Sequence, residues 1–193
     1  MKKVFLVLAA CAVVSAALVG CGSSSSTEST GSAATSTAAV SSNTEAESKQ
    51  NVNAEMQTFK DWEIQPKSIR YTDTVTDNGK STKAQDGNTF VIVDMDIKNL
   101  GTQASIFLPN TPLMEYLEAS VIYDGSYTYA DTAGLTGFDN NLSGMPVNPL
   151  ETKSGYLKFE VPAEVATSDK SLTLKIDFKS EFEEESSIEF PLR

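Results

Sequence analysis

The chain has 193 residues and a formal net charge of −11, with 15 basic and 26 acidic side chains. It contains no histidine, which excludes Ser-His-Asp and Cys-His catalysis as well as zinc or copper sites built on imidazole. An acidic surface of this kind makes nucleic acid and anionic lipid headgroups poor partners. Carboxylate chemistry and calcium bound by oxygen ligands remain open.

The N-terminus has the layout of a secretory signal, with Lys2 and Lys3 followed by an apolar run over residues 4–19. Within it, Leu18-Val19-Gly20-Cys21 resembles the bacterial lipoprotein cleavage motif, in which the cysteine is diacylated and becomes the new N-terminus. A competing match ending at Cys11 leaves an apolar core that is shorter than the roughly 7 to 15 residues a signal needs. We therefore expect residues 1–20 to be a lipoprotein signal peptide and Cys21 to carry the lipid. The alternative is an ordinary signal peptide with an incidental cysteine.

Two acyl chains hold a protein on a bilayer where one is marginal, so the predicted location is the extracytoplasmic face of the bacterial cell membrane. Residues 22–48 contain almost only Ser, Thr, Ala, Gly and Glu, which cannot bury enough apolar surface to offset the entropy of ordering. We expect residues 21–56 to form a disordered tether and residues 57–193 to form a single domain. With Cys11 removed and Cys21 acylated, that domain has no disulfide and depends on packing alone.

The domain opens with a strand predicted over residues 59–71, where apolar and aromatic side chains alternate on both sides of Pro66. Because proline removes a ladder hydrogen bond, we expect this strand to bend there and to lie outside the centre of a sheet. Residues 72–88 are polar and contain Asn78-Gly79 and Asp86-Gly87, two dipeptides typical of turns. They predict a long loop with room for a small hairpin.

Residues 89–99 give the clearest strand pattern, with one apolar face and one mostly polar face. The apolar positions are Val91, Val93, Met95 and Ile97. Such alternation is typical of an antiparallel sheet packed on one side. Residues 104–108 predict a shorter strand that ends at Pro109, and residues 113–117 fit a strand or a turn equally well.

Residues 121–123 and 126–129 flank Asp124-Gly125, which predicts a hairpin because this dipeptide accepts the positive φ angles of a tight turn. A long polar loop over residues 130–148 follows. Alternation then predicts three more strands, over residues 155–161, 172–178 and 188–192. No segment has a sustained helical period. About seven to nine short strands predict an all-β fold, an immunoglobulin-like antiparallel β-sandwich, with a small closed barrel as the alternative.

Two segments carry a resemblance to a known family. They are Gly87-Asn88-Thr89-Phe90-Val91-Ile92-Val93-Asp94 with Ile97-Lys98-Asn99-Leu100-Gly101, and Pro149-Leu150-Glu151-Thr152-Lys153-Ser154-Gly155-Tyr156-Leu157 with Phe159-Glu160-Val161-Pro162. Over residues 59–178 the chain resembles Gram-positive lipoproteins of unassigned function that carry an immunoglobulin-like domain similar to the immunoprotective-antigen fold. The resemblance implies an extracytoplasmic binding or accessory module and implies no enzyme. It brings no catalytic residues with it.

Tyrosines lie close in sequence to carboxylates and amides in the second half of the domain. The candidate ligand-binding residues are Tyr123, Tyr127, Tyr129, Asp131, Asp139 and Asn140. Tyrosine rings offer rigid contact area and the polar groups orient a ligand, as in surfaces that bind sugars or peptides. The alternative is structural, since tyrosine is common on strands and Asp and Asn are common in turns.

Asp124, Asp131 and Asp139 could instead supply oxygens to calcium, which takes about six to eight of them, although their spacing matches no standard calcium loop. No other cofactor is expected. Residues 181–185 carry four glutamates, which predict either a solvated loop or a surface for a basic partner. Asp94 and Asp96 point the same way on one strand and predict a solvated face rather than the paired carboxylates of a glycoside hydrolase.

These patterns predict a lipid-anchored, extracytoplasmic β-sandwich that binds a protein, peptide or glycan at the cell envelope and is not an enzyme. The alternative is a structural or calcium-dependent envelope module without a dedicated ligand. A hydrolase that uses carboxylates alone is the third hypothesis.

Overall fold

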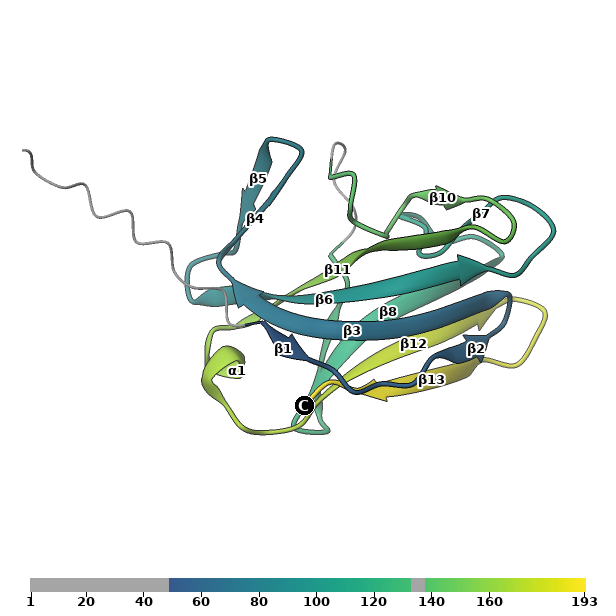
Figure 1. Cartoon of the computed structure of the whole chain (residues 1–193). Helices are drawn as coiled ribbons and strands as arrows, with labels where there is room; N and C mark the ends of the chain where they lie inside the picture. Colours follow the sequence, from purple (N-terminus) through teal and green to yellow (C-terminus); the bar gives the residue numbers. More distant parts are fainter. Residues whose placement is uncertain (1–48, 133–137) are drawn as a thin grey trace, which may run out of the picture. The chain divides into compact units, whose positions relative to one another are not determined.

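The computed structural model describes residues 49–132 and 138–193, which form one domain (Figure 1). The predicted signal peptide, the lipidation site Cys21 and the tether up to residue 48 lie outside the described residues.

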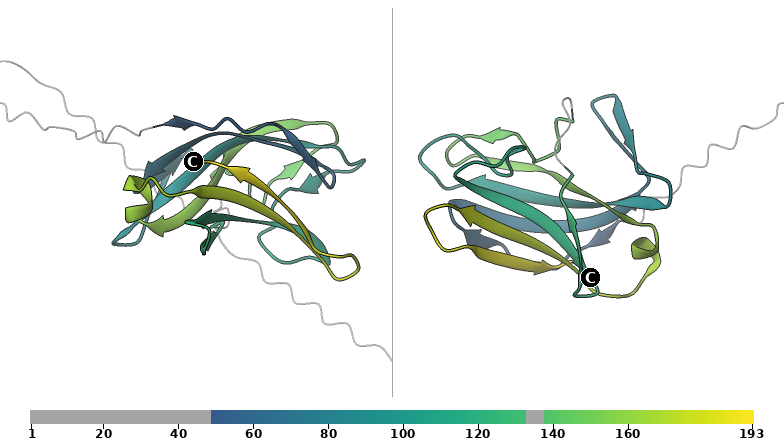
Figure 2. Two further views of the ribbon diagram at one scale, coloured as in Figure 1. Left: turned by 90° about the horizontal axis from the view of Figure 1, so that it is seen from below. Right: turned by 180° about the vertical axis from the view of Figure 1, so that it is seen from behind.

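Two antiparallel sheets lie face to face as the two layers of a β-sandwich (Figures 1 and 2). The first has the order β1-β3-β6-β11, with β2 also paired to β3: β1 (Gln50–Asn51), β2 (Gln57–Phe59), β3 (Trp62–Thr72), β6 (Asn88–Asn99) and β11 (Thr152–Pro162). The second has the order β13-β12-β8-β9: β8 (Glu115–Tyr123), β9 (Tyr127–Ala130), β12 (Leu172–Ser180) and β13 (Ser186–Pro191). These five- and four-stranded sheets confirm the predicted all-β antiparallel sandwich.

Smaller elements complete the domain. The hairpin β4 (Thr74–Asp77) and β5 (Lys80–Lys83) and the two-residue strand β10 (Pro146–Val147) lie in segments predicted as loops. The two-residue strand β7 (Ser105–Ile106) lies within the strand predicted over residues 104–108, and the single-turn helix α1 (Glu164–Thr167) follows β11. Within residues 49–132 and 138–193 no helix is long and apolar enough to cross a membrane.

The alternation read from the sequence determines which faces pack together. Val91, Val93, Met95 and Ile97 of β6 are at most 1% exposed and belong to the main core between the sheets. β12 contributes Leu172, Leu174 and Ile176, none of which is exposed. Burial of these faces is the main driving force for the sandwich, since each fully buried aliphatic side chain contributes about 1.5 to 3 kcal/mol.

Pro66 lies in a strand with neighbours on both sides, where the sequence predicted a position outside the centre of the sheet. β3 pairs with β6 on one side and with β1 and β2 on the other. The register with β6 shifts between Pro66 and Ser68, as the expected bend requires. The proline is tolerated because β2 pairs only up to Ile64 and β1 only from Ser68, so the ladder is interrupted where its N–H is missing.

A second, smaller core covers part of the outer face of the first sheet. The β4–β5 hairpin turns at Asn78-Gly79, whose φ angles are 48° and 74°. Beneath it six residues pack together: Val75, Ala84, Phe90, Ile92, Phe138 and Tyr156. This cluster explains why Phe90 and Ile92 occupy the face of β6 that also carries Asp94, Asp96 and Lys98.

The paired part of the chain begins before residue 57, the predicted start of the domain. Gln50 and Asn51 pair with Ile69 and Ser68 of β3, and the N–H of Val52 donates to the carbonyl oxygen of Lys67 at 2.8 Å. Val52 also packs against the main core, although composition had placed this stretch in the tether.

Leu150 has a φ of 62° although its side chain is 70% exposed. A residue with a Cβ pays about 1 to 2 kcal/mol for this left-handed conformation, and glycine avoids that cost. Part of the gain is lost, because glycine also makes the unfolded chain more flexible. We expect Leu150→Gly to raise the free energy of unfolding by about 0.5 to 1 kcal/mol in a urea denaturation experiment. Leu150→Ala keeps the Cβ and should bring no such gain; equal stabilisation by both variants would contradict this explanation.

Candidate functional site

The predicted tyrosines do not share one exposed surface. Tyr123 is 5% exposed, belongs to the main core and donates its hydroxyl to Ser168 Oγ at 2.8 Å. Tyr127 is 57% exposed, with its ring centroid 6.2 Å from that of Tyr123. Tyr129 is half-buried and packs against the core. Of the three, Tyr127 alone is freely available to a ligand.

Asp139 and Asn140 lie against the β4–β5 hairpin, on the outer side of the other sheet. Asn78 Nδ2 donates to Asp139 at 2.9 Å, while Asn140 donates its backbone N–H and its Nδ2 to Asp77 at 2.8 and 2.9 Å. Tyr156 also donates its hydroxyl to Asp77 at 3.2 Å, and burial together with the nearby Asp77 carboxylate raises the pKa of that phenol. These polar groups fasten the hairpin to β11.

Asp131 lies where the chain leaves β9 and joins the other sheet. Its N–H donates to the carbonyl oxygen of Ala119 on β8 at 2.9 Å, and the next N–H, of Thr132, donates to Lys158 on β11 at 2.8 Å. Its carboxylate accepts from the Ser143 hydroxyl and from the Lys158 N–H. Burial raises the pKa of Asp131 from 3.8 to about 6. Asp131 therefore supports the junction between the two sheets.

The three carboxylates predicted to bind calcium are held by different elements. Asp124 accepts from Lys170 Nζ at 2.6 Å, Asp131 from Ser143, and Asp139 from Asn78. No group of three His, Cys, Asp or Glu residues in the described part of the chain could hold a metal ion. The structure therefore does not bring Asp124, Asp131 and Asp139 together into the expected site, because their backbones belong to separate turns.

The raised pKa of Asp131 predicts a pH dependence of stability. Between pH 3.8 and about 6 the folded state holds a proton that the unfolded state has released, so protonation favours folding as the pH falls. We expect the Asp131→Asn variant to gain stability relative to the parent near neutral pH, with the difference shrinking towards about pH 5. Urea midpoints of both proteins across this range measure it; a difference independent of pH would contradict the assignment.

Asp94 and Asp96 lie on the outer face of the first sheet and are engaged by neighbouring side chains. Lys49 Nζ lies 3.1 Å from Asp94, and Lys67 pairs with Asp96, which also accepts from Ser154 Oγ at 2.6 Å. They fit the predicted solvated strand face, with cations interleaved between the acids.

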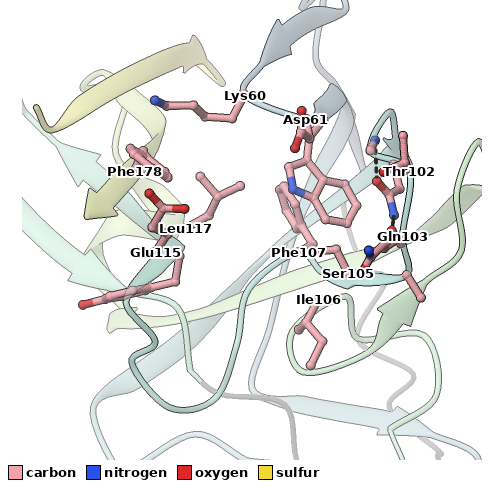
Figure 3. A pocket seen from close by; sticks show the side chains of 15 residues that line it. Lys60, Asp61, Thr102, Gln103, Ser105, Ile106, Phe107, Glu115, Leu117 and Phe178 are labelled. Atoms are coloured by element: carbon pink, nitrogen blue, oxygen red, sulfur yellow. Dashed lines mark hydrogen bonds between the residues drawn. The ribbon is translucent and has the colours of Figure 1, made fainter. Parts of the chain in front are cut away.

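A cleft opens at one end of the sandwich, between the two sheets, with a volume of about 430 Å³ (Figure 3). Its walls come from the β2–β3 turn, the β6–β7 loop, the start of β8 and the end of β12. The side chains that give it aromatic and aliphatic surface are Trp62, Ile106, Phe107, Tyr116, Leu117 and Phe178. Figure 3 shows Leu117, Phe178 and Glu115 on one side of the opening, facing Asp61, Thr102 and Phe107 on the other.

Aromatic contacts build the inner part of this cleft. Trp62 and Phe107 meet edge to face, with ring centroids 5.1 Å apart, and both are almost fully buried. At the opening, Lys60 Nζ lies 3.8 Å from the ring centroid of Phe178 and 2.8 Å from Glu183. Lys60 therefore connects the β2–β3 turn to the β12–β13 turn across the end of the sandwich.

Asn99 shapes the remaining wall. Its side chain is fully buried and donates to the carbonyl oxygens of Gln103 and Val147 at 2.8 and 2.9 Å, while it accepts from the Gly101 N–H at 2.8 Å. These bonds fix the loop after β6, which lines the cleft. The Asn-x-Gly sequence at the end of β6 thus has a defined structural role.

Negative charge dominates the rim. Asp61 and Glu115 line the cleft and are exposed, and within residues 49–132 and 138–193 no basic side chain pairs with either. The β12–β13 turn adds four exposed glutamates, Glu181, Glu183, Glu184 and Glu185. The N–H of Glu181 donates to the carbonyl oxygen of Met114 at 3.1 Å, which places this turn beside the start of β8. Lys60 and Lys179 are already paired, with Glu183 and Glu185.

Exposed apolar side chains accompany these acids. Ile106 lines the cleft and is 40% exposed, while Met114 and Phe182, next to the bond between Glu181 and Met114, are 64% and 70% exposed. The sequence pointed to the glutamates but not to the cleft beside them. Trp62, Phe107 and Phe178 lie far apart in the chain, and only the pairing of the sheets brings them together.

The two facing antiparallel sheets make this chain a β-sandwich, and several solved structures resemble it. An uncharacterised β-sandwich protein from Clostridium difficile is 23% identical, with a TM-score of 0.50, over 72% of this chain and 90% of that one. A conserved hypothetical protein from Bacillus anthracis is 13% identical, with a TM-score of 0.48, over 76% and 97%. A candidate lipoprotein from Bacillus subtilis is 14% identical, with a TM-score of 0.40, over 76% of this chain and 38% of its own.

The likeness to the Clostridium difficile protein shows the fold alone and confirms the sandwich part of the resemblance seen in the sequence. No protein-family model matches the chain, and no curated protein matches it either.

Proposed function

We propose that this protein is a lipid-anchored binding module of the cell envelope whose end cleft takes up a basic, partly apolar segment of a partner protein. The observation that carries the proposal is the combination, at one end of the sandwich, of an aromatic cleft with an acidic rim. Aromatic surface supplies contact area at low entropic cost, and a rim of one sign selects a partner of the other sign.

The charges around the cleft favour a cationic partner over a sugar or an acidic peptide. The one lysine that lines it, Lys60, is neutralised by Glu183, whereas Asp61 and Glu115 have no basic partner among the described residues. An acidic peptide would meet like charge at this rim. A neutral glycan would gain nothing from it.

The anchoring part of the proposal rests on the sequence. The Leu18-Val19-Gly20-Cys21 motif supports lipidation at Cys21, and the Ser- and Thr-rich stretch that follows supports a flexible connection to the membrane. A mass measurement on protein purified from its native membrane, showing two acyl chains on an N-terminal Cys21, is the expected result. A lipid-free N-terminus would contradict the anchor and leave the cleft hypothesis standing.

Binding at the cleft can be followed without a label, because Trp62 is the only tryptophan of the chain and lines the cleft. We expect a synthetic ten-residue peptide of alternating lysine and valine to change its emission in a saturable way at about 0.05 M salt. Affinity should fall steeply towards about 0.5 M, because screening shortens the reach of the rim charges. A glutamate-valine peptide of the same length should not bind.

Charge variants locate the binding surface. We expect Glu115→Gln and Asp61→Asn each to weaken binding of the lysine-valine peptide about two- to fivefold at low salt. The matched control is Asp86→Asn, which removes the same charge in the exposed turn before β6. The cleft lies at the other end of β6, about 35 Å from this turn. Equal loss in all three variants would show a general charge effect and contradict the proposed site.

A further inference from the structure

A second opening continues from the end cleft along the side of the sandwich, with a volume of about 400 Å³. Tyr116 and Leu117 of β8 line both openings. The opposite wall is also continuous, because residues 105–107 line the first opening and residues 108–110 line the second. Together they form a groove between β8 and residues 105–110, which we call the β8 groove.

The edge of β8 that borders this groove is only partly paired. On one side β8 pairs with β12 over its whole length, from Glu115 to Tyr123. On the other side it pairs with β9 only from Ser120 to Tyr123, and the last bond runs from the Asp131 N–H to the Ala119 carbonyl oxygen. The chain then crosses to β11. Among the described residues, nothing pairs on this side with the first part of β8, from Glu115 to Glu118.

The direction of the backbone groups follows from the ladder. Residues of an antiparallel strand direct their N–H and C=O groups to alternate sides. Because Ala119 bonds towards β9, Leu117 and Glu115 direct theirs to the same side, where β9 no longer runs. Met114 is one residue away from Glu115 and should therefore direct its groups to the β12 side. Its carbonyl oxygen does accept the Glu181 N–H there, as this alternation requires. Leu117 and Glu115 thus present backbone donors and acceptors to the β8 groove.

The corresponding edge of the first sheet is covered. The Tyr156 N–H of β11 donates to Asn140 O at 2.9 Å, and its carbonyl accepts from the Leu142 N–H at 3.0 Å. Thr132 donates to Lys158 further along the strand. Proteins usually protect such edges, because a row of open backbone groups is a template for another strand. In contrast, the edge of β8 from Glu115 to Glu118 is left unpaired beside the β8 groove and the acidic rim.

We propose that the partner segment binds as an added β-strand on the open edge of β8, lying in the groove between β8 and residues 105–110. The inference rests on the proposed function and specifies its geometry. Backbone hydrogen bonds to Leu117 and Glu115 supply affinity, and side chains on alternate positions reach either the aromatic cleft or the carboxylates. Asp61, Glu115 and Glu118 favour lysine or arginine at the outward positions. A second copy of this chain would bring the same acids against each other.

A backbone substitution in the peptide separates strand addition from binding by side chains alone. The probe is the lysine-valine peptide, compared with an analogue in which ester bonds replace four consecutive central amides. Two of the four lost N–H groups would face β8 in either register, because successive N–H groups alternate in direction. Binding as a strand predicts that the ester analogue binds about tenfold more weakly or worse, because two hydrogen bonds are lost. Equal affinity would overturn strand addition and leave the end cleft as the site. No binding of either peptide would overturn both proposals.

Amide exchange and one pair of variants test the β8 edge itself. Before peptide is added, the Leu117 amide should exchange faster than those of Tyr116 and Glu118, which face β12, and saturating peptide should slow it at least about tenfold. Glu115→Pro removes the charge and the edge N–H, whereas Glu115→Gln removes the charge alone. Strand addition predicts weaker binding by Glu115→Pro than by Glu115→Gln. Equal binding by both, or slow Leu117 exchange without peptide, would overturn the inference.

Discussion

Replacing Gly155 with alanine is expected to destabilise the domain by about 3 kcal/mol. A Cβ at this position would lie 2.3 Å from the carbonyl oxygen of Asn140 and 2.8 Å from Leu142 Cδ2. The first is a backbone atom held by the bond from Tyr156 N, so neither side can move without breaking the pairing of this segment with β11. The urea midpoint of the variant measures the loss.

Gly125→Ala is the matched control for this prediction. Gly125 has a φ of 68° and open space around its Cβ position, so alanine there meets only the backbone preference and should cost about 1 kcal/mol. A Gly155→Ala variant no less stable than Gly125→Ala would contradict the close approach of the two backbones at β11.

Asn99→Ala is the second change with a large expected effect, a loss of about 3 kcal/mol of stability. It leaves the carbonyl oxygens of Gln103 and Val147 and the N–H of Gly101 without their buried partner. Because the loop they belong to lines the cleft, we also expect the emission of Trp62 to change and binding of the lysine-valine peptide to weaken. Urea denaturation and the peptide titration measure the two effects.

Two further variants separate lost hydrogen bonds from lost volume. Asn99→Asp keeps the shape but replaces the amide donor with a carboxylate oxygen that faces the carbonyl oxygens of Gln103 and Val147, so it should be at least as unstable as Asn99→Ala. Thr102→Ala, an exposed change in the same loop, should stay within about 0.5 kcal/mol of the parent. A stable Asn99→Asp variant would show that the hydrogen bonds of Asn99 contribute little.

The sequence predicted the strands well because one face of each main strand is buried. A period of two, as in Val91, Val93, Met95 and Ile97, is imposed by the pleat and is therefore visible locally. Turn chemistry was equally local: Asp124 and Gly125 have φ angles of 51° and 68°, as the predicted hairpin requires. The position of the Pro66 strand within the sheet was predicted wrongly, because a proline is accepted there only through the places where β1 and β2 end.

The candidate site could not be predicted from the sequence in the same way. Neighbours in sequence, such as Tyr123 and Tyr127, differ in burial because one faces the core and the other closes a hairpin. The residues of the cleft come from four separate segments, and none carries a pattern that differs from an ordinary strand or turn. The acidic run at residues 181–185 was visible, and the alternative of a basic-partner surface is the one that the cleft beside it supports.

These features give each part of the chain a role in the proposed function. The tether predicted from composition would carry the domain away from the membrane, and the end cleft with the β8 groove would receive the partner. Tyr127, exposed on the hairpin at the other end of β8, contributes nothing to that surface.

The most direct test of the proposed binding site is a titration of the isotope-labelled protein with the lysine-valine peptide, followed by amide chemical shifts. We expect saturable shifts at Asp61, Gln103 and Leu117, with Asp86 and Tyr127 unchanged. Shifts centred on Tyr127 or on Asp139 and Asn140 would contradict it and return the site to the residues favoured by sequence alone. Shifts spread evenly over the acidic surface would show that the peptide recognises charge and no defined site.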